Sequence, residues 1–348
     1  MEMDKKDNRL LEWTINKAKT EFKDDICFML EHGKHTLPED SQVRFISGFV
    51  SNADHLIGMA RTFIINGIGY DYWQREWKDF ERIADIKDYY TCSLADAKLV
   101  YYKDEEDKQR FLYLQAKLRK NLDDPKYMYE RGLEWLDKAM DIYKTLLFEE
   151  ALCNVRMNAG FIADRLSVAV ACVNQKYFDN GVIAQIEPLS KMEYVPENFV
   201  ELYKKIVRSQ DIDELKSLSH EMLSSTKKFF KAQNKWVKNA QEKPDYQELA
   251  FWYQEGSYYF HRLYCHCRDN QPENAFHQCI NLQPEFNFLM EDFKISDLDL
   301  LSNFDADNLA EVAACAKIIE QRIISEIEGN GVTIEIYPTL EDFLEKNE

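Results

Sequence analysis

The sequence predicts an α+β protein in which a small mixed β-sheet is followed by a larger set of helices. Two observations support this class. The 348 residues include only 11 Gly and 8 Pro, less than the usual share of about 12%, so the chain has few turns and a β-sandwich or barrel is disfavoured. Strand-like runs are concentrated in the first 103 residues, whereas apolar residues at helical spacing dominate from residue 104 onward.

The first 103 residues mix short helices with short strands. Apolar residues at helical spacing predict a first helix over residues 8–24, and the apolar run over 26–30 predicts a buried strand. Polar and apolar residues alternate over 42–49, which predicts a strand with one buried face. The pair Asn66-Gly67 predicts a tight turn between two strands within 61–73. The remaining elements are helices over 52–60 and 75–85 and a strand over 98–102.

The pattern of the second part of the chain predicts a helical bundle. A first long helix is predicted from the apolar residues at 112, 114, 118 and 122. Further helices are predicted over 127–149, 150–175, 196–208, 211–240, 245–268, 271–283 and 305–328. The alternating residues 331–337 predict a short C-terminal strand. We therefore expect two domains, an α+β domain over residues 1–103 and a helical bundle domain over residues 104–348.

Charge and cysteine content narrow the classes of function. The net charge of −18, from 62 acidic and 44 basic residues, opposes binding to a long polyanion such as DNA. No apolar run approaches the ~20 residues that span a bilayer, and the N-terminus lacks the apolar core of a signal peptide. The eight cysteines predict buried thiols and no disulfide framework. We expect a cytoplasmic protein that binds neither nucleic acid nor membranes.

Several segments are similar to those of a known superfamily. These are Arg61–Trp73, Leu94–Lys103, Leu147–Cys153 and Ala159–Asp164. With the order of strand, Gly-containing loop, alternating strand, Asp-bearing strand and helical bundle, the chain resembles the nucleotidyltransferases. Its closest likeness is to bacterial proteins related to the kanamycin-type aminoglycoside nucleotidyltransferases, and it covers nearly the whole chain. We expect the binding site in the cleft between the α+β domain and the helical bundle, the default place for a ligand.

The chemical motif of that superfamily is only partly present. The resemblance implies Gly-Ser after the first strand, Asp-x-Asp on the second and a third carboxylate later, which together hold two Mg²⁺ ions and the triphosphate. This chain has Gly33-Lys34 and Gln42-Val43-Arg44 at the first two places, and Asp71 at the third. Because Arg44 repels a metal ion, we expect two-metal catalysis to be lost.

The same comparison assigns candidate roles to individual residues. Gly33, Lys34, Gln42 and Arg44 are candidates for nucleotide binding, since a tethered cation can pair with a phosphate without a metal. Asp71 is the candidate metal ligand, with Mg²⁺ as the cofactor only if the protein is an active enzyme. Glu150, predicted on a bundle helix, is the candidate general base. Each residue has a simpler alternative as a solvated surface side chain.

Three functions remain open from the sequence. The first is a pseudoenzyme that has kept the fold to bind a nucleotide, a small ligand or a protein partner. The second is an active Mg²⁺-dependent enzyme that transfers a nucleoside monophosphate to a small hydroxylated acceptor, where the acidic chain would suit a cationic acceptor such as an aminoglycoside. The third is one member of a toxin–antitoxin-like pair. The ligand, the partner and the oligomeric state, including a possible homodimer, are not specified by the sequence.

Overall fold

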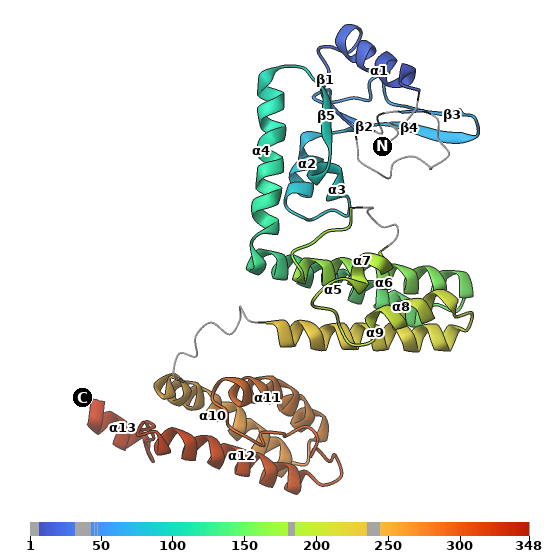
Figure 1. Cartoon of the computed structure of the whole chain (residues 1–348). Helices are drawn as coiled ribbons and strands as arrows, with labels where there is room; N and C mark the ends of the chain where they lie inside the picture. Colours follow the sequence, from blue (N-terminus) through green and yellow to red (C-terminus); the bar gives the residue numbers. More distant parts are fainter. Residues whose placement is uncertain are drawn as a thin grey trace. The chain divides into compact units, whose positions relative to one another are not determined.

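The N-terminal part of the chain folds around a five-stranded mixed sheet (Figure 1). The structure is a computed structural model that describes residues 7–31, 43, 44, 46, 48–179, 185–234 and 244–347. The strands are β1 (Ile26–Glu31), β2 (Gly48–Ser51), β3 (Arg61–Ile65), β4 (Ile68–Arg75) and β5 (Lys98–Tyr102). Their order in the sheet is β3-β4-β2-β1-β5. The pair β2–β4 is parallel and the other three pairs are antiparallel.

Helices make up most of the rest of the chain, so the predicted α+β class is confirmed. The helices are α1 (Arg9–Thr20), α2 (Trp77–Ala84), α3 (Cys92–Ala95), α4 (Glu105–Leu122), α5 (Pro125–Phe148), α6 (Leu152–Val173), α7 (Ile186–Ser190), α8 (Phe199–Arg208), α9 (Ile212–Gln233), α10 (Tyr246–Arg268), α11 (Pro272–Asp292), α12 (Leu309–Gly329) and α13 (Leu340–Asn347). Within the described residues, none of these helices has both the length and the apolar character needed to cross a bilayer.

Strand β1, which lies between β2 and β5, is buried on both faces. Met29 belongs to a core cluster with Ala18 of α1, whereas Phe28 packs against Trp77, Phe80 and Phe111 of α2 and α4. A strand covered on both sides needs an apolar run without alternation, which is the pattern of residues 26–30. At the edge of the sheet, Asn66 (φ 52°) and Gly67 (φ 79°) form the predicted hairpin turn, because both positions require left-handed backbone.

Four local predictions need correction. Residues 52–60 are not helical: Ile57 and Met59 are buried under the sheet, and the Ile57 amide donates to Oε1 of Gln74 (2.9 Å). Of the strand predicted over 42–49, residues 42, 45 and 47 lie outside the described residues; β2 extends beyond the prediction to Ser51, and Val43 forms an isolated bridge with Asp7. The helix predicted to end at residue 283 continues through Pro284 to Asp292, because Phe286 and Leu289 bury apolar surface that offsets the cost of about 3 kcal/mol for proline.

The fourth correction concerns the C-terminal strand. Residues 332–337 form neither a strand nor a helix. Ile334 is buried in a helical core, and the Glu335 amide donates to Oε1 of Gln254 on α10 (3.1 Å). The alternating pattern thus reflects one-sided burial against a helix rather than pairing with a strand.

The chain divides into two compact units at a different place from the predicted domains. Unit 1 comprises Met1–Val237 and unit 2 comprises Lys238–Glu348. The predicted boundary at residue 103 lies inside unit 1, because side chains of β1, α2 and α4 belong to the same buried cluster as those of α5, α6 and α9. Unit 2 has its own core, built from α10, α11 and α12.

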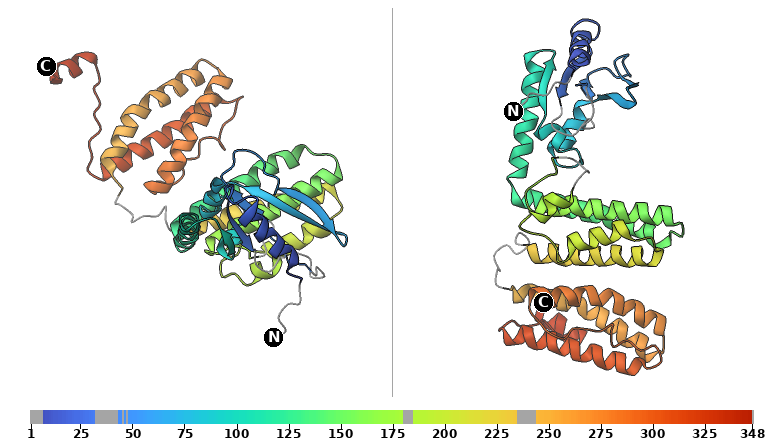
Figure 2. Two further views of the ribbon diagram at one scale, coloured as in Figure 1. Left: turned by 90° about the horizontal axis from the view of Figure 1, so that it is seen from above. Right: turned by 45° about the vertical axis from the view of Figure 1, so that its right-hand side comes forward.

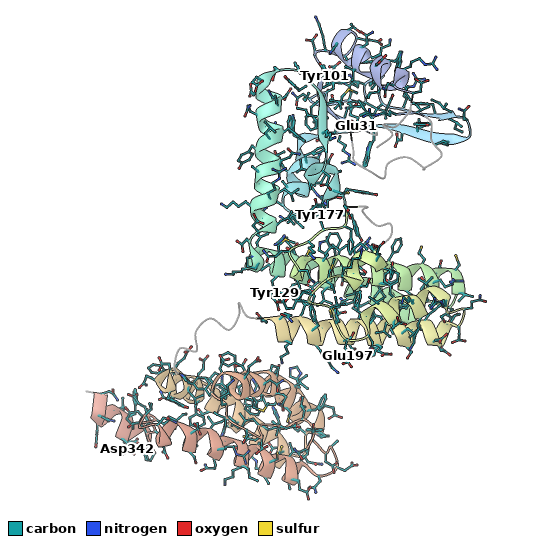
Figure 3. All side chains as sticks on the ribbon, viewed as in Figure 1. Glu31, Tyr101, Tyr129, Tyr177, Glu197 and Asp342 are labelled. Carbon is teal, nitrogen blue, oxygen red and sulfur yellow. The ribbon has the colours of Figure 1, made fainter. Side chains whose placement is uncertain are left out.

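The bundle of unit 1 depends on close contact between α5, α6 and α9, which run side by side in both views of Figure 2. Gly132 of α5 lies at this contact. A Cβ atom at this position would stand 2.9 Å from the ring of Phe230 on α9 and 3.1 Å from the carbonyl oxygen of Ala169 on α6. Nearby, the hydroxyl of Tyr129, labelled in Figure 3, donates to the carbonyl oxygen of Phe230 (3.0 Å).

Gly132→Ala should therefore destabilise the protein, although alanine favours helix. Overpacking in a filled core costs about 1–3 kcal/mol. Gly160→Ala is the matched control, because Gly160 lies in α6 and a Cβ there meets nothing within 4 Å; it should stabilise by about 0.5–1 kcal/mol. Urea denaturation of both variants measures the two changes, and equal stabilisation by both would contradict the tight contact.

The cysteines differ more in burial than the sequence predicts. Cys27, Cys172, Cys267 and Cys279 are buried as free thiols, Cys92, Cys265 and Cys315 are partly buried, and Cys153 is exposed. The expectation of buried thiols is therefore wrong for Cys153, because it lies on the solvent side of α6. Burial raises the pKa of Cys172 to about 12 and that of Cys279 to about 12.

Thiol labelling should separate these groups. At pH 8 Cys153 should react with N-ethylmaleimide first, whereas Cys172 and Cys279 should stay unmodified until the chain unfolds, since the thiolate is the reacting form. Peptide mass spectrometry over a time course measures the order, with protein in urea as the reference. Rapid labelling of Cys172 in the folded protein would contradict its burial.

Candidate functional site

The structure describes three of the six predicted site residues. Gly33, Lys34 and Gln42 lie outside the described residues. Arg44 precedes β2, and its guanidinium forms an ion pair with the carboxylate of Glu31 at the end of β1 (Figure 3 labels Glu31). The Arg44 amide donates to the carbonyl oxygen of Asp7 (3.0 Å). Arg44 is thus held beside the carboxyl end of β1 and already has one anionic partner.

Asp71 lies on β4 directly opposite Thr62 of β3 and is exposed. Its neighbours Tyr70 and Tyr72 point the other way, into the core cluster that contains Met29. Because Glu31 follows Met29 by two residues, the pleat puts Glu31 on the face opposite to Asp71. The structure therefore does not bring Asp71 and the Arg44–Glu31 pair to one face of the sheet.

Glu150 is not on a helix, contrary to the expectation. It is exposed in the connection between α5 and α6. The preceding residue, Glu149, has extended backbone (ψ 139°), which ends α5. The start of α5 contacts the segment after α2 through Tyr127, whose hydroxyl donates to the carbonyl oxygen of Asp85 (3.0 Å). Glu150 follows the opposite end of this helix of 24 residues. At 1.5 Å per residue the two ends are about 36 Å apart.

The structure instead gathers functional groups along one face of β4. Asp71, Trp73 and Arg75 alternate with the inward-facing tyrosines and share the face directed toward α2. The Arg75 guanidinium carbon lies 4.6 Å from the centre of the Trp73 ring and 5.6 Å from that of Phe80. Trp73 is 53% exposed. We call Asp71, Trp73 and Arg75 the β4 face.

Arg75 forms no ion pair with any residue that the structure describes, whereas the nearby Arg44, Arg110 and Arg165 each pair with a carboxylate. Burial lowers its pKa, an effect that the charges of Asp88 and Asp79 oppose. A partly buried guanidinium that rests on aromatic rings keeps its donors available for an anion.

Glycine opens the sheet next to Trp73. Gly48 of β2 pairs with Trp73, and a Cβ atom on Gly48 would stand 2.9 Å from the Trp73 carbonyl oxygen. The missing side chain lets the two parallel strands approach and leaves no Cβ atom of Gly48 beside Trp73. Gly48 thus combines a packing requirement with access to the β4 face.

A partly buried carboxylate connects the loop next to Arg75 with the bundle. Asp164 of α6, whose side chain is 14% exposed, accepts hydrogen bonds from the Tyr89 hydroxyl (3.0 Å) and the Gln185 amide (2.7 Å). It also pairs with Arg165 (2.5 Å). Burial raises the pKa of Asp164, and the hydrogen bond from Gln185 opposes this shift.

Aromatic and basic side chains stack beside this carboxylate. The Arg165 guanidinium lies 3.9 Å from the centre of the Tyr89 ring, and the rings of Tyr89 and Trp135 are 4.6 Å apart. On Trp135, the Lys138 ammonium group lies 3.6 Å from the ring centre. Burial lowers the pKa of both Arg165 and Lys138. The stack fixes Tyr89, whose neighbours Asp88 and Tyr90 are close enough to Arg75 to affect its pKa.

No family model, no curated protein and no solved structure matches the chain. The chemistry of the site therefore rests on its own residues. Within the part of the chain that the structure describes, no three His, Cys, Asp or Glu side chains are grouped so that they could hold a metal ion. What the β4 face offers is a flat indole for stacking, a guanidinium for an anion and a carboxylate for a hydroxyl or amine.

Sequence reasoning missed Arg75, Trp73 and the Asp164 carboxylate as functional groups. The signal for the first two was present, because Asp71, Trp73 and Arg75 follow one another at the two-residue period of a strand. Asp164 lies in a segment that carries the family resemblance, but its burial depends on Tyr89 and Gln185, which are distant in sequence.

Asp164→Ala should loosen the attachment of the loop that carries Tyr89. The change leaves the Tyr89 hydroxyl and Arg165 without their shared partner, which should cost about 2–4 kcal/mol in the free energy of unfolding. Asp141→Ala, which removes an exposed partner of Lys144, should have no measurable effect. Urea denaturation compares the two variants, and equal stabilities would show that Asp164 is dispensable for folding.

Proposed function

We propose that this chain is a nucleotidyltransferase-like protein that binds a nucleotide on the β4 face and does not catalyse transfer. The observation that carries the proposal is the Arg75 guanidinium, which has no described ionic partner and lies beside the exposed Trp73. The α+β fold agrees with the family that the sequence resembles. The same family supplies the expectation that the ligand carries a phosphate.

The two side chains suit the two ends of a nucleotide. An aromatic ring can stack on any base, which contributes about 1–3 kcal/mol. A guanidinium binds phosphate through paired hydrogen bonds. Trp73 and Arg75 are two residues apart on one strand face, about 7 Å apart along the backbone, and the guanidinium lies over one face of the indole, 4.6 Å from its centre. A base that stacks on the other face of the indole can extend its phosphate past the ring edge toward the guanidinium. Asp71, two residues in the other direction, can accept a hydrogen bond from an exocyclic amino group of the base.

The residues near the expected metal site support binding without catalysis. Two-metal transfer needs several carboxylates around the ions. Among the described residues, Asp71 is the carboxylate of the β4 face, and Arg44 adds a positive charge beside Glu31. These residues do not fit a pair of Mg²⁺ ions, so no step of the proposed function depends on a metal.

Calorimetric titration of ATP and GTP tests the proposal. Both should bind, and binding should persist in EDTA. Arg75→Gln should weaken binding about 10- to 100-fold, the value of a charged hydrogen bond of about 1.5–3 kcal/mol, and Trp73→Leu about 5-fold or more.

Arg61→Gln is the matched control, because Arg61 also lies over an aromatic ring (5.7 Å from the centre of Phe63) but pairs with Tyr72 and so lies on the opposite face. It should bind nucleotide like the natural protein. Absence of binding would contradict the nucleotide proposal. Binding that requires Mg²⁺, together with nucleotide turnover, would support the active enzyme instead.

A further inference from the structure

Unit 2 carries most of the negative charge of the chain. Residues 238–348 contain 8 basic and 22 acidic residues, a net charge of −14 out of the total of −18. A compact unit with this imbalance attracts cations and repels anions. A ligand site on unit 2 is therefore expected to have chemistry opposite to that of the β4 face.

Unit 2 contains a pocket of about 470 Å³ between α10 and α11, lined by Trp252, Glu255, Gly256, Tyr259, Asn281, Leu282 and Glu285. This volume falls within the range of about 300–1,000 Å³ typical of small-molecule sites. Two aromatic rings and two carboxylates supply most of the lining. The pocket is independent of the proposed nucleotide site, because all its residues belong to unit 2.

The geometry of the pocket is fixed by one hydrogen bond and one glycine. The Trp252 indole nitrogen donates to Oε2 of Glu285 (3.1 Å), which connects α10 with α11 and orients the ring. Gly256 lies one turn after Trp252, and a Cβ atom there would stand 3.8 Å from the indole. Because Gly256 has no side chain, the ring has open space on this side.

Neither carboxylate of the pocket is neutralised. Within the described part of unit 2, Glu255 and Glu285 form no ion pair with a basic side chain. Glu255 and Tyr259 are exposed. The pocket therefore combines negative charge with two aromatic side chains, and carboxylates beside aromatic rings are the combination that binds organic ammonium ions.

We infer that this pocket binds a small organic cation with a bulky ammonium head group. The head group would lie against Trp252 and Tyr259, with Glu255 and Glu285 balancing its charge. A bulky alkylated ammonium ion is favoured over a metal cation, since it is weakly hydrated and gains from contact with aromatic faces. The volume beyond the head group leaves room for the body of the ligand.

Titration of the full-length protein with choline tests this inference. Choline binding, measured by calorimetry or by ligand-observed NMR, should be stronger than that of its neutral isostere dimethylbutanol, in which carbon replaces nitrogen. The double variant Glu255→Gln, Glu285→Gln should weaken choline binding about 5-fold or more. Trp252→Leu should weaken it about 3- to 30-fold, in line with a cation–π contribution of about 0.5–2 kcal/mol.

A double variant with the same change in net charge is the control. Glu273→Gln, Glu291→Gln alters two exposed residues of α11 that do not line the pocket, and it should bind choline like the natural protein. The inference is overturned if choline and its isostere bind equally, if the two double variants weaken binding equally, or if choline does not bind at millimolar concentration. A folded Trp252→Leu protein with unchanged affinity would also overturn it.

Discussion

The arrangement of unit 1 depends on the partly buried carboxylate of Asp164. A carboxylate removed from water costs several kcal/mol unless hydrogen bonds and opposite charge compensate it. Tyr89, Gln185 and Arg165 provide that compensation, and they come from three separate parts of the chain. The sheet part, the bundle and the segment before α7 are therefore connected at one point. The loop that carries Tyr89 gains its position next to Arg75 from the same contact, so folding and the proposed nucleotide site share one requirement.

The two units differ in the charge they offer to a ligand. Unit 1 is nearly balanced, with 36 basic and 40 acidic residues, whereas unit 2 is strongly acidic. In unit 1, basic groups are held on aromatic rings: Arg75 on Trp73, Arg165 on Tyr89 and Lys138 on Trp135. In unit 2, aromatic rings stand beside carboxylates. Aromatic side chains thus accompany basic groups at the proposed anion site of unit 1 and carboxylates at the proposed cation site of unit 2.

Local sequence patterns predicted most elements but not their assembly. The Asn66-Gly67 turn, the buried strand at residues 26–30 and the long amphipathic helices depend on neighbouring residues alone, and these predictions are confirmed. The prediction of a strand at 331–337 is wrong because alternation of polar and apolar residues indicates only that one side of the segment is buried, and a helix can bury that side as well as a strand can. The unit boundary was missed because helices before and after residue 237 have the same apolar periodicity. Likewise, Arg75 and Asp164 acquire their chemistry from partners distant in sequence, which no local pattern contains.

The strand order also determines how the sheet meets other polypeptides. β3 is an outer strand, and hydrogen-bonding groups along its free side are not paired within the sheet. Such a side can recruit a strand from another chain and start aggregation. β3 limits this risk through its length of five residues, a charged Arg61 at its first position and the tight turn that follows it. Ile64 already exposes an apolar side chain on this strand, so apolar replacements of its exposed neighbours would make the edge more prone to pair with another chain. A strand that contributes little to the core therefore affects the tendency of the folded protein to aggregate.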